Sequence, residues 1–175
     1  MFVPRAARLQ ASELTISPDR VIRDRQPTDT CCTRMMLLDL EGEFFFGAAP
    51  ELDRYFDGLR ERSDLRVIVL RVKRTRNPDI VCMERLQHFI VEMQTKGMVV
   101  LLCGVRPAFA QVMENLRFQD FLSADRVFLE DAALVGSATL AAVRHAYDLL
   151  GDDICEYCPR RTSPEPANGA FYYQI

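Results

Sequence analysis

The stretch VIVLRVKRTRNPDIVCMERLQHFIVEMQTKGMVVLLCGV, residues 67–105, decides the fold class. It begins with the apolar, largely β-branched run 67–70, and the apolar run 98–105 follows Gly97 with the same character, so both are expected to be buried strands. Between them, apolar residues recur at helical spacing, at positions 83, 86, 89, 90 and 93. A strand, a helix and a second strand form a βαβ unit, which predicts two parallel strands in an α/β domain.

The flanking segments continue this alternation. Residues 35–40 and 43–46 are expected to form a hairpin joined at Glu41 and Gly42, because glycine supplies the positive φ that a tight turn requires. A short edge strand is expected over residues 127–129. Three further helices are expected, beginning near Pro50, at Pro107 and over residues 132–150. The order β-β-α-β-α-β-α-β-α predicts a small mixed sheet with about four helices packed against it.

Composition changes near both ends of the chain. Residues 1–33 have balanced charges and short apolar patches, and they predict a linker or N-terminal arm with one strand at residues 13–16. Residues 34–151 form the predicted domain, which Gly151 ends as a helix cap. Residues 152–175 are rich in proline and polar residues and predict a poorly ordered C-terminal tail.

Charge and hydropathy restrict the partners of the chain. The 175 residues include 22 basic and 25 acidic side chains, a net charge of -3 that favours no nucleic acid. No stretch approaches the roughly 20 apolar residues of a membrane span, and the first residues lack the core of a signal peptide, so we expect no direct membrane insertion. The six cysteines indicate reduced thiols in a cytoplasmic protein rather than a disulfide framework.

Two strings carry a resemblance to a known family. They are LEGEFFFGAAPELDRYF, residues 40–56, and KGMVVLLCGVRPAFAQVMENLRFQDFLSADRVFLEDAALVGSATLAAV, residues 96–143. Together with the order of elements, they resemble the STAS domain, and specifically the C-terminal cytoplasmic domain of SulP-family sulfate and anion permeases. The resemblance covers about residues 35–150 and implies a STAS-like (SpoIIAA-like) α/β fold.

The same resemblance implies a function. It points to a regulatory, non-catalytic domain of a SulP-type sulfate or anion transporter, placed in the cytoplasm at the inner face of the plasma membrane. The partner would be the transporter's own membrane domain, and the residues before Cys31 would follow its last membrane span. The alternative is a free-standing STAS signalling protein, similar to an anti-sigma-factor antagonist, that binds a regulatory protein partner. Apolar spans upstream in the reading frame would distinguish the two.

Anti-sigma-factor antagonists carry a D-S-[ST]-G motif at the start of the central helix, where a kinase phosphorylates the first hydroxyl. In this sequence the motif falls on Asp79, Ile80, Val81 and Cys82, so only the aspartate is retained. Neither Ile80 nor Val81 has a hydroxyl, which excludes phosphorylation at the inherited position. Asp79 is expected to stabilise the first turn of the helix as a carboxylate.

The end of the first strand of the βαβ unit is the candidate binding surface. Arg74, Arg76, Asn77 and Asp79 lie beside a helix N-terminus, where an anion or a charged partner would be favoured. The same resemblance places the contact surface of related domains at this end. A solvated loop is the alternative interpretation, since runs of charge usually belong to exposed faces.

No catalytic group emerges from the sequence. Cys155 and Cys158 have the spacing of a redox or zinc motif, but the segment lacks the strand and helix context and the further local ligands. A composite metal site with His145 and the pair Cys31 and Cys32 remains open. The sequence contains no nucleotide-binding motif and no activated nucleophile, so we expect no enzyme activity, no cofactor and no metal.

The apolar residues near the N-terminal arm suggest self-association. A strand at residues 13–16 would offer an unpaired edge, and the run Phe44, Phe45 and Phe46 would offer apolar area that a second copy could cover. We therefore expect a homodimer to which the arm contributes. An arm that folds back on its own domain is the alternative.

Overall fold

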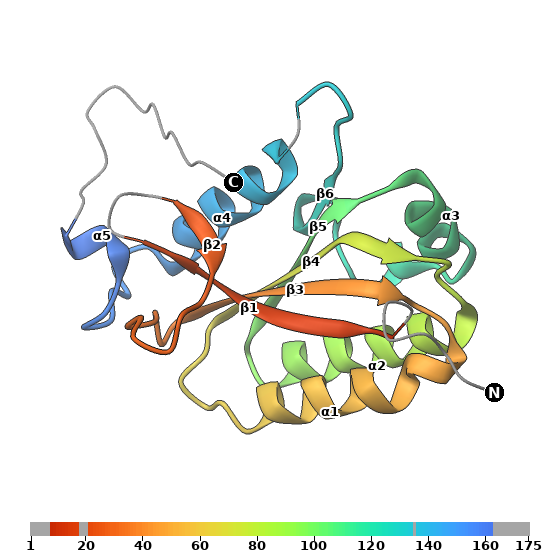
Figure 1. Ribbon diagram of the computed structural model, residues 1–175, viewed down its shortest axis with the longest axis horizontal. Helices are drawn as coiled ribbons and strands as arrows, with labels where there is room; N and C mark the ends of the chain where they lie inside the picture. Colours follow the sequence, from red (N-terminus) through yellow and green to blue (C-terminus); the bar gives the residue numbers. More distant parts are fainter. Residues whose placement is uncertain (1–7, 18–20, 135, 163–175) are drawn as a thin grey trace.

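The computed structural model describes residues 8–17, 21–134 and 136–162. They form a six-stranded mixed sheet in the order β2-β1-β3-β4-β5-β6 (Figure 1). β3, β4, β5 and β6 run parallel, and β1 is antiparallel to β2 and β3. The α/β class and the parallel βαβ unit predicted from the sequence are confirmed. The strands are β1 (Gln10–Ile16), β2 (Ile22–Asp24), β3 (Met35–Glu43), β4 (Val67–Arg76), β5 (Val99–Val105) and β6 (Val127–Leu129).

Helices cover both faces of this sheet. α1, α2 and α3 pack on one face, and α4 packs on the other (Figure 1). Proline lies in the first turn of α1 and of α3. Backbone N–H groups in a first turn have no acceptor within the helix, so proline, which lacks this group, costs no hydrogen bond there. The described residues include five α-helices: α1 (Ala49–Arg60), α2 (Ile80–Thr95), α3 (Pro107–Asn115), α4 (Ser137–Leu150) and α5 (Pro159–Thr162). None of these helices has both the length and the apolar character that a bilayer span requires.

The core has two layers, one on each face of the sheet. On the α1–α3 face, Phe56 and Phe89 stack with their ring centroids 3.9 Å apart, which locks α1 against α2. On the other face, Ala142, Val143 and Ala146 of α4 pack on the sheet, and their small size allows close approach. The helical apolar stripe predicted for the central helix is the buried side of α2.

The predicted hairpin at Glu41 and Gly42 is wrong. β3 is one continuous strand through both residues, and it pairs in parallel with β4. Gly42 does have a positive φ of 114°, but the reason is a close approach rather than a turn. A Cβ at Gly42 would overlap the backbone carbonyl of Arg8, so glycine lets the N-terminal segment cross the strand.

The last helix begins later than the sequence predicted. α4 starts at Ser137 instead of residue 132. Asp131 accepts a hydrogen bond from the Ala133 N–H at 2.8 Å and forms a local turn, and Gly136 has a left-handed φ of 85° that interrupts a helix. The high alanine content predicted a helix from residue 132, but the segment before Ser137 forms this turn instead.

Segments assigned to the N-terminal arm belong to the sheet. Residues 13–16 lie within β1, and β2 is an additional strand. β1 pairs with β2 on one side and with β3 on the other, so it is not the unpaired edge on which the dimer prediction was based. The edge strands β2 and β6 have three residues each, a length that limits pairing with another copy. Residues 1–7 of the arm lie outside the described residues.

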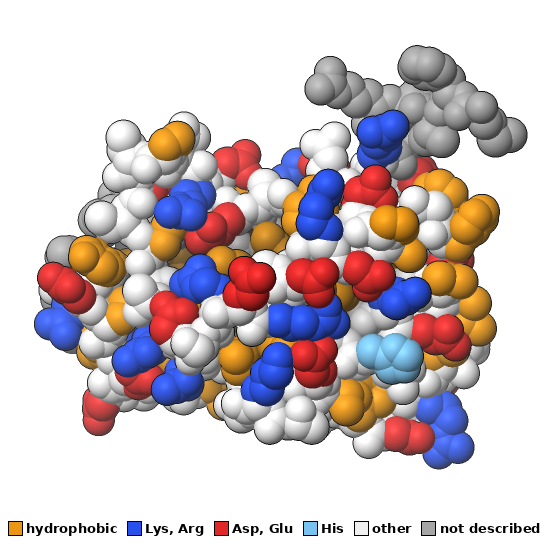
Figure 2. All heavy atoms as spheres, turned by 90° about the horizontal axis from the view of Figure 1, so that it is seen from below, with side chains coloured by type: hydrophobic (Ala, Val, Ile, Leu, Met, Phe, Trp, Pro, Cys, Tyr) orange, Lys and Arg blue, Asp and Glu red, His pale blue; other side chains and the backbone are white. Residues whose placement is uncertain are grey.

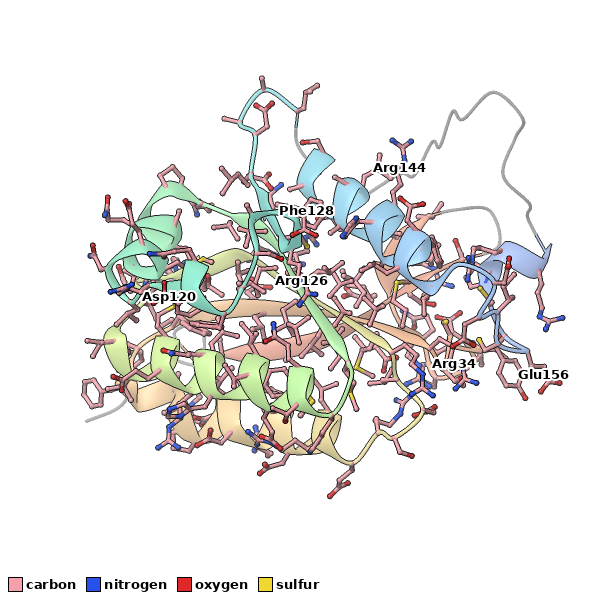
Figure 3. All side chains as sticks on the ribbon, turned by 180° about the vertical axis from the view of Figure 1, so that it is seen from behind. Arg34, Asp120, Arg126, Phe128, Arg144 and Glu156 are labelled. Carbon is pink, nitrogen blue, oxygen red and sulfur yellow. The ribbon has the colours of Figure 1, made fainter. Side chains whose placement is uncertain are left out.

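The C-terminal segment, residues 151–162, folds back onto the domain. It packs beside α4, with Cys155 and Cys158 buried in the apolar cluster of that face. Arg34 and Glu156 therefore lie at the same end of the molecule, far from Asp120 (Figure 3). The rest of the predicted tail, residues 163–175, lies outside the described residues.

Candidate functional site

The start of α2 lies at the carboxyl end of β4, where the family motif was aligned. Asp79 precedes the helix with an extended backbone, and its Oδ1 accepts a hydrogen bond from the Cys82 N–H at 3.0 Å. Its second carboxylate oxygen accepts from the Phe46 N–H, and its own N–H donates to the Phe44 carbonyl at 2.9 Å. Asp79 thus caps the helix and joins the end of β3 to the start of α2.

The three positions after Asp79 carry no group suited to phosphoryl transfer. Ile80 is 56% exposed and Val81 is 36% exposed, and both are purely apolar. Cys82 is buried and its thiol donates to the Phe45 carbonyl at 3.0 Å. Burial, with Asp79 nearby, raises the pKa of Cys82 to about 12, so the thiol stays protonated at neutral pH. A nucleophile is therefore missing at each of these positions.

Exposed apolar side chains flank Asp79, the residue that caps α2. Phe46, which donates its N–H to Asp79, is 67% exposed and begins the short 3-10 helix, Phe46–Ala48, that follows β3. We call Phe46, Ile80 and Val81 the α2-start surface. Exposed large apolar residues that gather around one backbone feature are typical of a contact surface, whereas single exposed apolar residues are common everywhere.

Arg76 and Asn77 share one internal partner. The Glu43 carboxylate lies 3.2 Å from Arg76 Nε and accepts a hydrogen bond from Asn77 Nδ2 at 2.6 Å. Asn77 has a positive φ of 49°, a conformation that asparagine tolerates better than most residues. The structure therefore brings Arg76 and Asn77 together beside the α2-start surface, and both side chains bind Glu43 at the end of β3.

Arg74 lies in a different environment. Its guanidinium lies 2.5 Å from Asp39 Oδ2 and 3.0 Å from Glu41. Asp39 is only 1% exposed and also lies 3.4 Å from Arg71. Burial raises the pKa of Asp39, and the two guanidinium groups oppose this rise. The contacts of Arg74 therefore serve a buried ion pair between β3 and β4, in contrast to those of Arg76.

A register shift explains why two arginines meet one aspartate. Asp39 pairs with Arg71 and Glu41 pairs with Arg74, so β4 has one residue more than β3 between these pairs. Such a bulge turns both arginine side chains toward Asp39. The sequence analysis missed the acidic partners, although their alternation in β3 was a legible signal. They are Asp39, Glu41 and Glu43, and the false hairpin concealed them.

Two grooves lie near these charges. One, of about 430 Å³, lies at the carboxyl ends of β4 and β5 and is lined by Arg76, Asn77 and Arg106 among others. A wider open groove of about 1010 Å³ lies between β4 and the start of α4 and includes Arg71, Lys73 and Arg74. Lys73 pairs with Glu130 at 2.6 Å, so these three cations all have carboxylate neighbours.

The face formed by α1 and α2 carries both signs of charge. Acidic and basic side chains lie interspersed across it (Figure 2), and several of them pair across the two helices. Arg60 bridges Asp57 and Glu92, and Arg85 lies 3.4 Å from Asp53. A surface that mixes charges in this way has no field of one sign to attract a polyanion.

The candidate metal ligands are not assembled. In the part of the chain that the structure describes, no group of three or more His, Cys, Asp or Glu side chains is placed to hold a metal ion. His145 instead lies 3.9 Å from Asp125 and beside the Phe128 ring. Cys155 lies against Cys32, 3.6 Å away between sulfur atoms.

Comparison with known proteins identifies the class of this fold. The family model of the STAS domain matches residues 26–132, so the chain belongs to the STAS domain family. A search among curated proteins found no match.

Solved structures of transporter proteins are among those similar to this chain. The chain is similar to the sulfate transporter family protein from Wolinella succinogenes, with 25% identity and a TM-score of 0.54 over 66% of this chain and 87% of that chain. The murine solute carrier 26 family member A9 anion transporter shares the fold, with 9% identity and a TM-score of 0.66 over 82% of this chain and 23% of that chain. The SulP transporter STAS domain from Vibrio cholerae has 23% identity and a TM-score of 0.46, over 70% and 90%.

Proposed function

We propose that this chain is the non-catalytic regulatory domain of a SulP-type anion transporter and that it contacts the transporter's membrane domain through the α2-start surface. Membership of the STAS family and the similarity to the sulfate transporter family protein from Wolinella succinogenes support the transporter assignment. The chain spans 23% of the murine anion transporter, as expected for one domain of a membrane protein. Such a domain lies in the cytoplasm at the inner face of the plasma membrane.

The single observation that carries the proposal is the chemistry at the start of α2. The position that a kinase modifies in antagonists is occupied here by Ile80, which is more than half exposed. An exposed apolar side chain at this place is costly in water and gains free energy when a partner covers it. The position has therefore changed from a covalent switch to a permanent contact, while Asp79 keeps the helix start rigid.

Arg76 extends this contact with charge. Its side chain is more than half exposed, and the residue lies next to Asn77 at the rim of the surface. A polar rim around an apolar centre is the usual arrangement of a protein interface. Arg74 belongs to the original candidate set, but its contacts with buried Asp39 indicate a role in the fold.

The complete coding region and a transport assay test the proposal. We expect the coding region to contain apolar spans of roughly 20 residues upstream. In the complete transporter, Ile80→Asp is expected to change sulfate uptake several-fold, because a carboxylate placed in an apolar contact loses its hydration. Val91→Asp is the matched control, since Val91 is also exposed on α2 but lies away from its start.

Two outcomes would contradict the proposal. A coding region without upstream spans would leave the alternative of a free-standing signalling protein that binds another partner. Equal uptake by the Ile80→Asp and Val91→Asp variants, at equal protein levels, would remove the α2-start surface from the function.

A homodimer stays a prediction of its own. The described part of β1 is paired on both sides, so a dimer would have to use another surface. Removing residues 1–33 would delete two strands of the sheet, and light scattering on the whole chain across a concentration series is the suitable test.

A further inference from the structure

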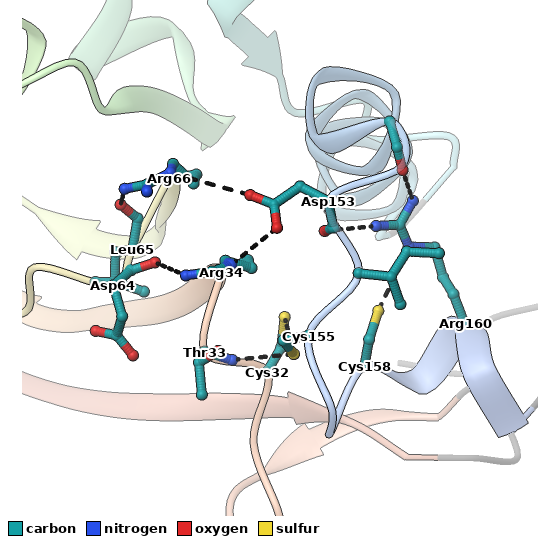
Figure 4. Close-up of polar contacts among 12 residues, drawn as sticks. Cys32, Thr33, Arg34, Asp64, Leu65, Arg66, Asp153, Cys155, Cys158 and Arg160 are labelled. Atoms are coloured by element: carbon teal, nitrogen blue, oxygen red, sulfur yellow. Dashed lines mark hydrogen bonds and ion pairs between the residues drawn. The ribbon is translucent and has the colours of Figure 1, made fainter.

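Two of the six cysteines lie in contact although they are far apart in the sequence. The sulfur atoms of Cys32 and Cys155 are 3.6 Å apart, and 123 positions separate the two residues (Figure 4). Cys32 precedes β3, and Cys155 lies in the segment that follows α4. Cys82 and Cys103 are buried elsewhere, and burial raises the pKa of each to about 12. Cys32 and Cys155 differ from these two core thiols because each has a second sulfur in contact.

The contact is held from both sides. The Thr33 N–H donates to the Cys155 sulfur at 3.4 Å, and Arg34 Nε lies 2.9 Å from the Asp153 carboxylate (Figure 4). Arg161 Nε also donates to the Cys155 carbonyl at 2.8 Å. These bonds fix the segment around Cys155 against the residues around Cys32. A disulfide forms readily only between thiols whose backbones already hold them close.

The environments of the two sulfurs differ. Burial opposes ionisation of Cys155, but the Thr33 N–H and the Cys32 thiol favour its charged form, and the net effect lowers the pKa of Cys155. Burial dominates at Cys32 and raises the pKa of that thiol. Cys155 is thus the better nucleophile and Cys32 the resolving thiol. A cavity of about 20 Å³ lies beside Cys32 and is large enough for about one water molecule.

We propose that Cys32 and Cys155 form a reversible disulfide bond when a peroxide oxidises the chain. The Cys155 thiolate attacks one oxygen of hydrogen peroxide, and the O–O bond breaks. The other oxygen departs as hydroxide, and Cys155 becomes a sulfenic acid. Cys32 then attacks the Cys155 sulfur as its thiol proton is lost, so the S–S bond forms, the S–O bond breaks and a second hydroxide leaves. The two hydroxides take up the two thiol protons as water. Two thiols lose two electrons, which reduce one peroxide.

The bond would tie the C-terminal segment to the start of the sheet. Residues 151–162 are held by hydrogen bonds and ion pairs that open and close, and a covalent link would prevent the segment from leaving. The site is independent of the transporter assignment, because it lies at the amino ends of the parallel strands, away from the start of α2.

Peptide mapping of the purified whole chain tests the proposal. After treatment with hydrogen peroxide and without a reductant, we expect one cross-linked peptide pair that contains Cys32 and Cys155, with the loss of two hydrogen atoms. Dithiothreitol should restore the separate peptides. Cys32→Ser and Cys155→Ser should each abolish the pair, whereas Cys31→Ser, which changes the neighbouring thiol, should retain it.

Wild-type mapping keeps the test decisive even if a variant fails to fold. A Cys155–Cys158 or Cys31–Cys155 link as the main product, or oxidation to unlinked sulfinic acids, would overturn the proposal and leave the two thiols as small apolar core residues. As a second readout, trypsin cleavage after Arg160 and Arg161 should slow several-fold in the oxidised chain. Equal cleavage of the oxidised and reduced chains would contradict the tethering of the segment.

Discussion

The two ends of the parallel strands contrast in the chemistry they retain. At the carboxyl ends, Asp79 is engaged as a helix cap, and exposed Ile80 lies where the resemblance to anti-sigma-factor antagonists would place a hydroxyl. At the amino ends, Cys32 and Cys155 lie in sulfur contact. Cys155 lies outside the residues that match the family model. One end thus carries exposed apolar side chains beside a capping carboxylate, and at the other end a segment outside the family match places a thiol against Cys32.

A second contrast runs along β3 and β4. Asp39, Glu41 and Glu43 face arginines, but the environment changes from fully buried at Asp39 to partly exposed at the end of the ladder, where the side chains of Glu43 and Arg76 are 21% and 57% exposed. The same type of ion pair should therefore contribute very differently at its two ends.

The largest effect is expected from Asp39→Asn. This change leaves Arg71 buried beside a neutral side chain, so the free energy of unfolding should fall by about 3 kcal/mol. Glu43→Gln is the matched change at the more exposed end, where Arg76 is open to water, and should cost less than about 1 kcal/mol. Urea unfolding of both variants measures the difference. Equal losses would show that burial does not distinguish the two ends.

A smaller effect is expected from Gly42→Ala. The positive φ and the overlap with the Arg8 carbonyl should together lower the free energy of unfolding by about 2 kcal/mol. Gly58→Ala serves as the control, because Gly58 lies in α1 with open space around it and should gain up to about 1 kcal/mol. If Gly42→Ala were neutral, the N-terminal segment would not be held against β3 as the structure shows.

The parts of the fold that the sequence predicted share a simple physical signature. In β4, α2 and β5 the spacing of the apolar residues fits only one type of secondary structure. The tertiary packing buries the same residues that this spacing selects. The failures came where a local signal has two explanations. Gly42 allows the backbone at Arg8 to approach closely and does not form a turn. Before Ser137, the Asp131 side chain accepts a hydrogen bond from the Ala133 N–H, and this local turn replaces the expected helix.

The candidate site divides in the same way. The lack of a hydroxyl at positions 80 and 81 can be read directly from the sequence. The partners of Arg74 and Arg76 depend on the register of β3 against β4, and a bulge shifts that register by one residue. The contact between Cys32 and Cys155 depends on how the chain returns after α4, which no local pattern records.

The smallest effect concerns the segment that leads to Cys32. The hydrogen bond from Arg23, with one from the Gln26 N–H, lowers the pKa of Asp29 to about 2, from an ordinary value of 3.8. The folded state therefore holds the proton less tightly than the unfolded state, so the stabilisation is present above pH 3.8 and is lost as the pH falls toward about 2. The stability difference between wild type and Asp29→Asn should shrink over this interval. A difference independent of pH would contradict the assignment.

Hydrogen–deuterium exchange of the complete transporter, compared with the isolated chain, tests the contact at the start of α2 most directly. The Ile80 and Val81 amides lie in the first helical turn, where no helical acceptor protects them, so their exchange reports coverage by a partner. We predict slower exchange of the peptide spanning residues 78–84 in the complete transporter than in the isolated chain. Equal exchange in the two proteins would contradict the proposal that this surface contacts the membrane domain.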